Sequence, residues 1–115
     1  MKRGEIWWAD REPSVGAEAN KRRPVVIVSN DTNNAVARQL GRGVVTVVPI
    51  TSNVARVLSF QVLLRAGVAG LNQDSKAQAE QVRAIDVTRL RGCSGTLGVD
   101  EMTAIDAALR RHLAL

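Results

Sequence analysis

The hydrophobic positions of the chain gather in short runs separated by polar, glycine-containing segments. Two of these runs, PVVIVS (24–29) and VVTVVPI (44–50), are β-branched and apolar at successive positions. Such runs are typical of strands buried on both faces, and Pro24 is tolerated because it begins its strand. Further strands are predicted at EIWWAD (5–10), LSFQVLL (58–64) and GCSGTLG (92–98), and SKAQAEQVRAID (75–86) predicts two short strands or one bent strand.

Two segments carry the signals of helices. In NDTNNAVARQL (30–40), Asn30 or Asp31 can cap the helix, and three apolar side chains then share one side, Ala35, Val36 and Leu40. In the C-terminal segment, a cap at Asp100 precedes residues at helical spacing, Met102, Ile105, Leu109 and then His112 or Leu113. Acidic residues at the start of this helix and basic residues at its end complement the helix dipole.

The order of these elements indicates a fold in which strands dominate. Residues 11–23, which contain Pro13 and Gly16, predict a long mobile loop, and the other connections are short. We therefore expect a mainly β fold with helices (α+β), built as a small, strongly curved antiparallel sheet or barrel with one packed terminal helix. A chain of 115 residues suits one core, so a single domain over residues 1–115 is expected.

The charge balance points to a polyanionic partner. The chain has 16 Lys and Arg against 11 Asp and Glu, a net charge of +5. A small basic domain attracts RNA, DNA or an acidic protein. No apolar run approaches the roughly 20 residues of a membrane span, and the N-terminus lacks the apolar stretch of a secretory signal. We expect a cytoplasmic protein without membrane contact.

Few familiar catalytic groups are present. The sequence has one histidine, one cysteine and no carboxylates at metal-ligand spacing, so neither a metal nor another cofactor is expected. There is no glycine-rich phosphate loop. A serine or cysteine hydrolase would need a histidine as base, and His112 is expected at the exposed end of the terminal helix.

A set of polar residues remains beside the buried strands. They are Arg22 and Arg23 before one strand, Thr51 and Ser52 after another, Glu18 in the long loop, and Glu80, Gln81 and Arg83 near the later strands. Arginine suits a phosphodiester because its planar guanidinium donates two hydrogen bonds to phosphate oxygens and stays protonated. With a hydroxyl and a carboxylate, such groups could cleave RNA without a metal, by attack of its own 2′-hydroxyl. Each could equally form a surface ion pair or a turn hydrogen bond.

The two tryptophans, Trp7 and Trp8, fall on opposite faces of one predicted strand. We expect one of them in the core. The other could pack at a dimer interface or stack on a base.

Several short motifs follow one another in an order that is specific when they are taken together. They are RGEIWWAD (3–10), PSVGAE (13–18), RRPVVIVSND (22–31), VVPITSN (47–53), FQVLL (60–64), GL (70–71), AEQVRAID (79–86) and a closing G-x-L before the terminal helix. Over nearly the whole chain, this series resembles the MazF/PemK (Kid) family of toxins from bacterial type II toxin–antitoxin systems.

The resemblance implies a fold, an activity and partners. The fold would be a small SH3-like barrel of the CcdB/Kid/MazF type. The protein would be a homodimer that cleaves single-stranded RNA, such as mRNA, at short specific sequences without a metal, leaving 2′,3′-cyclic phosphate and 5′-hydroxyl ends and inhibiting translation. A cognate antitoxin with an acidic, flexible tail would block the RNA groove. Two alternatives stay open, a non-catalytic toxin of the same fold that poisons a protein such as DNA gyrase, and an inactive RNA-binding module.

The resemblance also implies roles for individual residues. Arg23 would stabilise the transition state and could protonate the leaving oxygen, Thr51 would orient the phosphate or assist the 2′-hydroxyl, and Glu18 would be the base or an RNA contact. The RNA-binding residues would be Lys21, Arg22, Ser52, Asn53, Glu80, Gln81 and Arg83.

The identity of the base stays open between Glu18 and Glu80. In the Kid branch of the family, an aspartate base acts with an arginine and a loop histidine. The matching positions here are Glu80, Gln78 and Ala17, so only the carboxyl group is kept.

Overall fold

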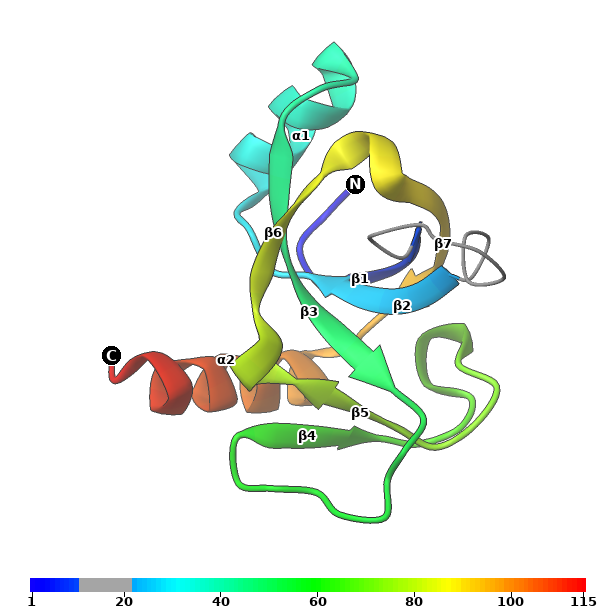
Figure 1. Cartoon of the computed structure of the whole chain (residues 1–115), viewed down its shortest axis with the longest axis vertical. Coiled ribbons are helices and arrows are strands. Elements are labelled where there is room, and N and C mark those ends of the chain that lie inside the picture. The colour runs from blue at the N-terminus through cyan, green and yellow to red at the C-terminus, as the bar shows by residue number, and fades with distance from the viewer. Residues whose placement is uncertain (11–21) are drawn as a thin grey trace, which may run out of the picture.

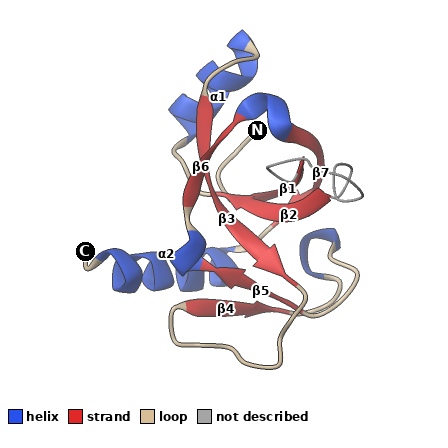
Figure 2. Cartoon of the chain, viewed as in Figure 1, coloured by secondary structure: helices blue, strands red, loops and turns tan. Residues whose placement is uncertain are grey.

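Seven strands and two α-helices make up the part of the chain that the computed structural model describes, residues 1–10 and 22–115 (Figures 1 and 2). The strands are β1 (Glu5–Asp10), β2 (Arg22–Ile27), β3 (Val44–Thr51), β4 (Gln61–Leu64), β5 (Ser75–Gln78), β6 (Arg83–Asp86) and β7 (Leu90–Thr96). The helices are α1 (Asp31–Leu40) and α2 (Val99–Leu113), with 3₁₀ turns η2 (Val68–Gly70), η3 (Ala79–Gln81) and η4 (Val87–Arg89). Most of the predicted loop at 11–23, including Glu18 and Lys21, lies outside the described residues.

The strands form one curled antiparallel sheet. Their order is β4–β5–β3–β2–β1–β7, and β6 pairs with β3 outside this path. Among the described strands the path ends at β4 and β7, so the sheet curls without closing (Figure 1). α2 packs against β4 and η3. The predicted mainly β fold with a packed C-terminal helix is confirmed. The predicted curved sheet or barrel is a curled sheet that stays open between β4 and β7.

The core is divided between the two faces of β1 and β2. Trp7 and Val25 belong to one hydrophobic cluster, whereas Ile6 and Val26, at alternate positions, belong to a second cluster with Ile105 of α2. Fully burying one such aliphatic side chain contributes about 1.5–3 kcal/mol. The prediction that the second strand is buried on both faces is confirmed.

The two tryptophans differ in burial, as their alternation along β1 predicted. Trp7 is 8% exposed, its indole Nε1 donates to Glu5 Oε1 at 2.9 Å, and the Arg38 guanidinium lies 5.3 Å from the ring centroid. The expectation of one core tryptophan is therefore confirmed. Trp8 is half-buried, and its packing at a dimer interface or on a base stays a prediction.

Strand β2 begins two residues before the apolar run that predicted it. Arg22 and Arg23 were expected in the loop, but they pair with Asp10 and Ala9 of β1. Backbone pairing with β1 does not require apolar side chains, so the ladder continues past Pro24. The correction matters for the site, because both arginines are mounted on a strand.

The strand predicted at 58–64 is shorter than expected. Gln61 closes a turn with Leu58, since its backbone N–H donates to the Leu58 carbonyl and its side-chain Oε1 accepts from the Leu58 N–H. Only the four residues of β4 remain paired. The 75–86 segment gives two strands, β5 and β6, on either side of η3, which confirms one of its two predicted forms.

Helix α1 has the predicted cap but buries a different side. Asn30 caps it, accepting from the Asn33 N–H at 2.8 Å. The apolar residues expected to share its packed side, Ala35, Val36 and Leu40, are exposed. The helix instead buries Ala37 and Asn34, which is 0% exposed and bonded to Ser29 through its oxygen and its nitrogen. Helical periodicity alone did not reveal that an asparagine could be buried with both amide groups bonded.

Helix α2 begins at Val99, and its N-cap is Gly98 rather than the predicted Asp100. The side chain of Glu101 accepts from the Gly98 N–H at 2.9 Å, while Asp100 lies in the first turn. Ile105 is buried as predicted, whereas His112 and Leu113 at the end of the helix are exposed. No described helix combines the length and apolar character that crossing a bilayer requires.

Candidate active site

A cavity of about 360 Å³ opens where β2 begins and β3 ends. Its floor is apolar and its rim is polar. The apolar residues are Ala9, Val25, Val47, Pro49, Ile50 and Ile85, and the polar residues are Asp10, Arg23, Thr51, Gln78, Arg83 and Arg89. Most of these apolar residues also belong to the hydrophobic cluster that contains Trp7. The polar rim is therefore mounted on closely packed strands.

The register of the sheet brings Arg23 and Thr51 together. Val25 of β2 pairs with Pro49 of β3. When this register is continued by two residues, Arg23 falls opposite Thr51 on the same face, because side chains alternate along a strand. Both residues line the cavity, so this pair is where the sequence-based assignment placed the centre of the site.

Both members of the pair have hydrogen-bonding capacity available. Arg23 is exposed, and its guanidinium has no hydrogen bond or ion pair within residues 1–10 and 22–115. Thr51 Oγ1 accepts from the Asn53 N–H at 3.2 Å. Accepting that bond leaves the hydroxyl proton of Thr51 free to donate to another oxygen. The pair can therefore donate to an anionic group in the cavity.

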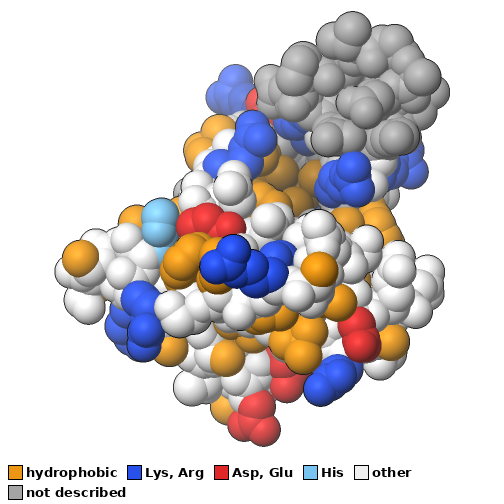
Figure 3. Space-filling model, turned by 60° about the horizontal axis from the view of Figure 1, so that its bottom comes forward, with side chains coloured by type: hydrophobic (Ala, Val, Ile, Leu, Met, Phe, Trp, Pro, Cys, Tyr) orange, Lys and Arg blue, Asp and Glu red, His pale blue; other side chains and the backbone are white. Residues whose placement is uncertain are grey.

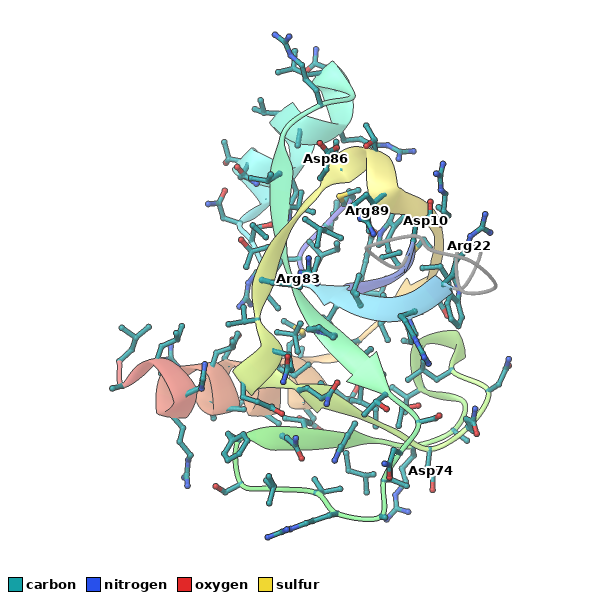
Figure 4. The ribbon with its side chains drawn as sticks, viewed as in Figure 1. Asp10, Arg22, Asp74, Arg83, Asp86 and Arg89 are labelled. Carbon is teal, nitrogen blue, oxygen red and sulfur yellow. The ribbon has the colours of Figure 1, made fainter. Side chains whose placement is uncertain are left out.

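Two further arginines reach the rim from β6 and η4. Arg83 pairs with Val47 in the β6–β3 ladder, and the guanidinium of Arg89 donates to the Asp10 carbonyl oxygen. In Figure 4, Arg83, Arg89, Asp10 and Arg22 follow an arc from β6 to the beginning of β2. Arg83 was predicted from the sequence, but Arg89 was missed. It lies in a short 3₁₀ turn with no pattern of its own to single it out.

Asp10 holds two arginines beside the cavity, and sequence reasoning missed it. Its carboxylate accepts from Arg22 Nε at 3.3 Å and from Arg91 Nε at 2.6 Å. The hydrogen bond from Arg91 is the largest cause that keeps the pKa of the Asp10 carboxyl below its ordinary value, Arg22 adds to it, and desolvation opposes both. Asp10 in turn raises the pKa of Arg91. The pairing of β1 with both β2 and β7 creates this contact, which no local motif could show.

The other predicted site residues do not gather at the cavity. Ser52 and Asn53 are exposed immediately after β3, and Gln81 is exposed on η3. Glu80 does not line the cavity, and its Oε2 accepts from Gln61 Nε2 at 2.8 Å. Glu18 and Lys21 lie outside the described residues. The structure thus brings together Arg23, Thr51 and Arg83 of the predicted set and leaves Glu80 and Gln81 apart from them.

The described ranges contain no group of three or more His, Cys, Asp or Glu residues that converge as metal ligands. The cavity rim in these ranges carries three arginines and one carboxylate, that of Asp10. A positive rim over a rigid apolar floor is suited to an anionic ligand such as a phosphodiester.

The family follows from comparison of the sequence with known proteins. Residues 2–113 match the sequence model of the PemK-like, MazF-like toxins of type II toxin–antitoxin systems. The chain belongs to this family. The family predicted from the motifs is therefore confirmed.

Two relatives and one solved structure illustrate the membership. The chain is 55% identical to endoribonuclease MazF9 of Mycobacterium tuberculosis, over 100% of this chain and 98% of that protein. It is 34% identical to endoribonuclease EndoA of Bacillus subtilis, over 100% of this chain and 96% of the relative. Its fold matches an endoribonuclease solved in complex with its cognate antitoxin, from a mycobacterial species, with a TM-score of 0.78 at 20% identity, over 100% of this chain and 96% of that chain.

Proposed function

We propose that the protein is a toxin endoribonuclease that cleaves single-stranded RNA at the Arg23–Thr51 cavity without a metal ion. The predicted enzyme class, an endoribonuclease, is confirmed by relatives of that name at 55% and 34% identity over the whole chain. The observation that supports the location is the exposed Arg23 guanidinium, without a partner in the described residues, which lines the same cavity as Thr51 where β2 begins and β3 ends.

The proposed chemistry uses the RNA as its own nucleophile. The 2′-hydroxyl attacks the adjacent phosphorus, the bond to the 5′-oxygen of the next nucleotide breaks, and a proton passes from the 2′-oxygen to a base. The products are a 2′,3′-cyclic phosphate and, once the leaving oxygen is protonated, a 5′-hydroxyl. Arg23 would donate two hydrogen bonds to the phosphate oxygens as negative charge builds on them. Thr51 would donate to one of these oxygens and orient the phosphate.

The remaining arginines fit the path of the RNA on either side of the cleaved bond. Arg83 and Arg89 line the cavity, and Arg22 and Arg91 lie beyond Asp10 at its edge. Each cation that meets a phosphate releases counterions and strengthens binding. The half-buried ring of Trp8 offers a face on which an RNA base could stack. The same face could instead pack against another subunit.

The mechanism also needs an acceptor for the proton of the 2′-hydroxyl. Asp10 is the one carboxylate on the described rim, and its two arginine partners keep it ionised but weakly basic. Glu18 and Glu80 were the candidates from the sequence. Because Glu80 lies away from the rim, Glu18 is the stronger of the two in our proposal.

We also propose the partners that the sequence predicted. A cognate antitoxin would place an acidic tail over the arginines of the rim, since carboxylates and phosphates use the same guanidinium donors. The solved structure with the similar fold is an endoribonuclease in complex with its cognate antitoxin. We further propose a homodimer that acts on RNA in the cytoplasm and inhibits translation.

The deciding experiment incubates purified protein with a long unstructured RNA in excess chelator and maps both the cut sites and the end groups. We expect cuts at one recurring short sequence, with 5′-hydroxyl ends, which disappear in Arg23→Ala. Absence of cleavage by folded protein over a range of RNAs would reject the proposal. That result would favour a toxin directed at a protein such as DNA gyrase, or a silent RNA-binding module.

A further inference from the structure

Residues 52–60, which we call the β3–β4 segment, are linked to Thr51 by a series of hydrogen bonds. The Asn53 N–H donates to Thr51 Oγ1 at 3.2 Å, and the Ala55 N–H donates to Asn53 Oδ1 at 3.3 Å. In Figure 1 this segment runs along the lower edge of the molecule, below β4. Figure 3 turns this edge toward the viewer and shows charged and hydrophobic side chains interleaved on it. The position of the segment is therefore tied to that of the Thr51 hydroxyl group.

Lys76 of β5 holds the middle of the β3–β4 segment. Its Nζ donates to the carbonyl oxygen of Arg56 at 2.5 Å, and the residue is only 9% exposed. The backbone of Lys76 also pairs with Thr51 in the sheet. Lys76 thus contacts both the strand end that carries Thr51 and the segment that follows it. A buried ammonium group that lost this carbonyl would be left unsatisfied, which makes the contact costly to break.

Gln61 and Glu80 hold the far end of the β3–β4 segment. Gln61 Oε1 accepts from the Leu58 N–H at 3.0 Å, and Gln61 Nε2 donates to Glu80 Oε2 at 2.8 Å. An amide that is bonded through both its oxygen and its nitrogen has one preferred orientation. Glu80 therefore fixes the Gln61 side chain, and Gln61 fixes the backbone at Leu58.

We infer that Glu80 is a positioning residue, which acts with Gln61 and Lys76 to hold the β3–β4 segment against the end of β3. Glu80 is outside the cavity rim. Its Oε2 is engaged by Gln61, and its Oε1 is buried without a hydrogen-bond partner in the described residues. A general base has to reach the proton that it removes, and neither oxygen is placed to do so. The consequence for cleavage rests on the proposed function, whereas the consequence for the segment does not.

Two substitutions of Glu80 separate positioning from proton transfer. Glu80→Gln keeps an oxygen that can accept from Gln61 but cannot serve as a base, and Glu80→Leu removes both properties. A lost general base costs about 100- to 10,000-fold in kcat, whereas we expect Glu80→Gln to stay within about fivefold of the wild type. We expect Glu80→Leu and Gln61→Leu to lower kcat/KM about 10- to 100-fold, because misplaced catalytic groups cost rates of this size.

A second measurement follows the β3–β4 segment without measuring RNA cleavage. Trypsin cleaves after arginine, and Arg56 is exposed while its carbonyl is held by Lys76. We expect Lys76→Met to speed cleavage at Arg56 about tenfold, as for loss of one charge-assisted hydrogen bond. Arg65→Met is the control, because Arg65 pairs with Asp74 and not with the β3–β4 segment. Amide exchange at Ala55 and Leu58 should accelerate in Lys76→Met and in Glu80→Leu, but not in Glu80→Gln.

Two results would overturn the inference. The first is loss of cleavage in folded Glu80→Gln with normal amide exchange, which would show that Glu80 acts through its charge or its proton. The second is unchanged trypsin cleavage and amide exchange in folded Lys76→Met and Glu80→Leu. If the wild-type protein cleaves no RNA, the proposed function fails, and the trypsin and exchange measurements still decide whether these residues hold the segment.

Discussion

Arg91 of β7 reaches Asp10 of β1 with two nitrogens, and its Nε and Nη2 both lie 2.6 Å from Asp10 Oδ2. Arg22 of β2 approaches the other carboxylate oxygen of Asp10 at 3.3 Å. Asp10 on β1 thus holds one arginine from each of the two strands, β2 and β7, that pair with β1. This contact organises the positive edge of the candidate site, although Asp10 itself is negative.

The Asp10 cluster predicts a pH-dependent contribution to stability. The folded pKa of Asp10 is lowered from 3.8, so its contribution is fully present above that pH and is lost as the pH falls through the folded value. We expect Asp10→Asn to lower the melting temperature at pH 7, and the difference from the wild type to shrink at pH 3 and below. Asp74→Asn is the control, since its ion pair with Arg65 is 3.7 Å long and more exposed. A difference that is equal at both pH values would contradict this explanation.

Arg23 is predicted to act through the shape of its guanidinium as well as its charge. We expect Arg23→Lys to lose at least about 100-fold in kcat under single-turnover conditions, because an ammonium cannot form the paired hydrogen bonds to two phosphate oxygens. Arg23→Ala should lose at least as much. Both variants should melt close to the wild type, because the Arg23 side chain is exposed and its guanidinium has no partner within the described residues. Near-normal cleavage by Arg23→Lys would mean that Arg23 contributes charge alone.

The salt dependence of RNA binding should identify the cations on the RNA path. Each phosphate contact with a single strand contributes about 0.7 to the slope of log K against log salt. We expect Arg83→Gln, at the cavity rim, to reduce the slope by about that amount. Arg65→Gln should leave it unchanged, because Arg65 and its partner Asp74 lie away from the cavity, as the position of Asp74 in Figure 4 shows. Equal slopes for the two variants would mean that the RNA does not contact Arg83.

Two glycines of β7 make a matched pair for testing the packing of η2. A Cβ at Gly95 would lie 2.6 Å from the backbone carbonyl of Ala69, whereas a Cβ at Gly92 would have no neighbour within 4 Å. We expect Gly95→Ala to destabilise the protein by about 1–3 kcal/mol, because the backbone of η2 would have to shift. Gly92→Ala should be neutral or slightly stabilising. Urea denaturation of both variants measures the difference, and equal stabilities would show that η2 moves away without cost.

The strands were the most predictable part of the fold. The bounds of β1 match the segment EIWWAD, and the β-branched runs became β2 and β3. The helix faces were less predictable, because the exposed Val36 and the buried Asn34 reverse the usual preference. Asn34 is accommodated by two hydrogen bonds to Ser29, which depend on how the chain turns before α1.

The site was predictable where it depends on one strand and unpredictable where it depends on several. Arg23 and Thr51 follow from their places at the ends of buried runs, and the structure brings them to one cavity with Arg83. Arg89 and Asp10 were missed, since they reach the rim only through the β1–β7 and β1–β2 pairings. Glu80 is close to Arg83 in the sequence, but Glu80 lies in η3 whereas Arg83 begins β6, and only Arg83 lines the cavity.

The sequence by itself determined the family, the buried strands and the polar residues that stand at their ends. These features are local, since alternation along a strand depends only on the position of each residue in its own segment. The tertiary structure alone decided that five arginines gather around Asp10 and the cavity, and that Glu80 is bonded to Gln61. The reason is that strand register and neighbour order come from pairing and packing between distant segments. A short motif carries no information about the partner strand that will lie beside it.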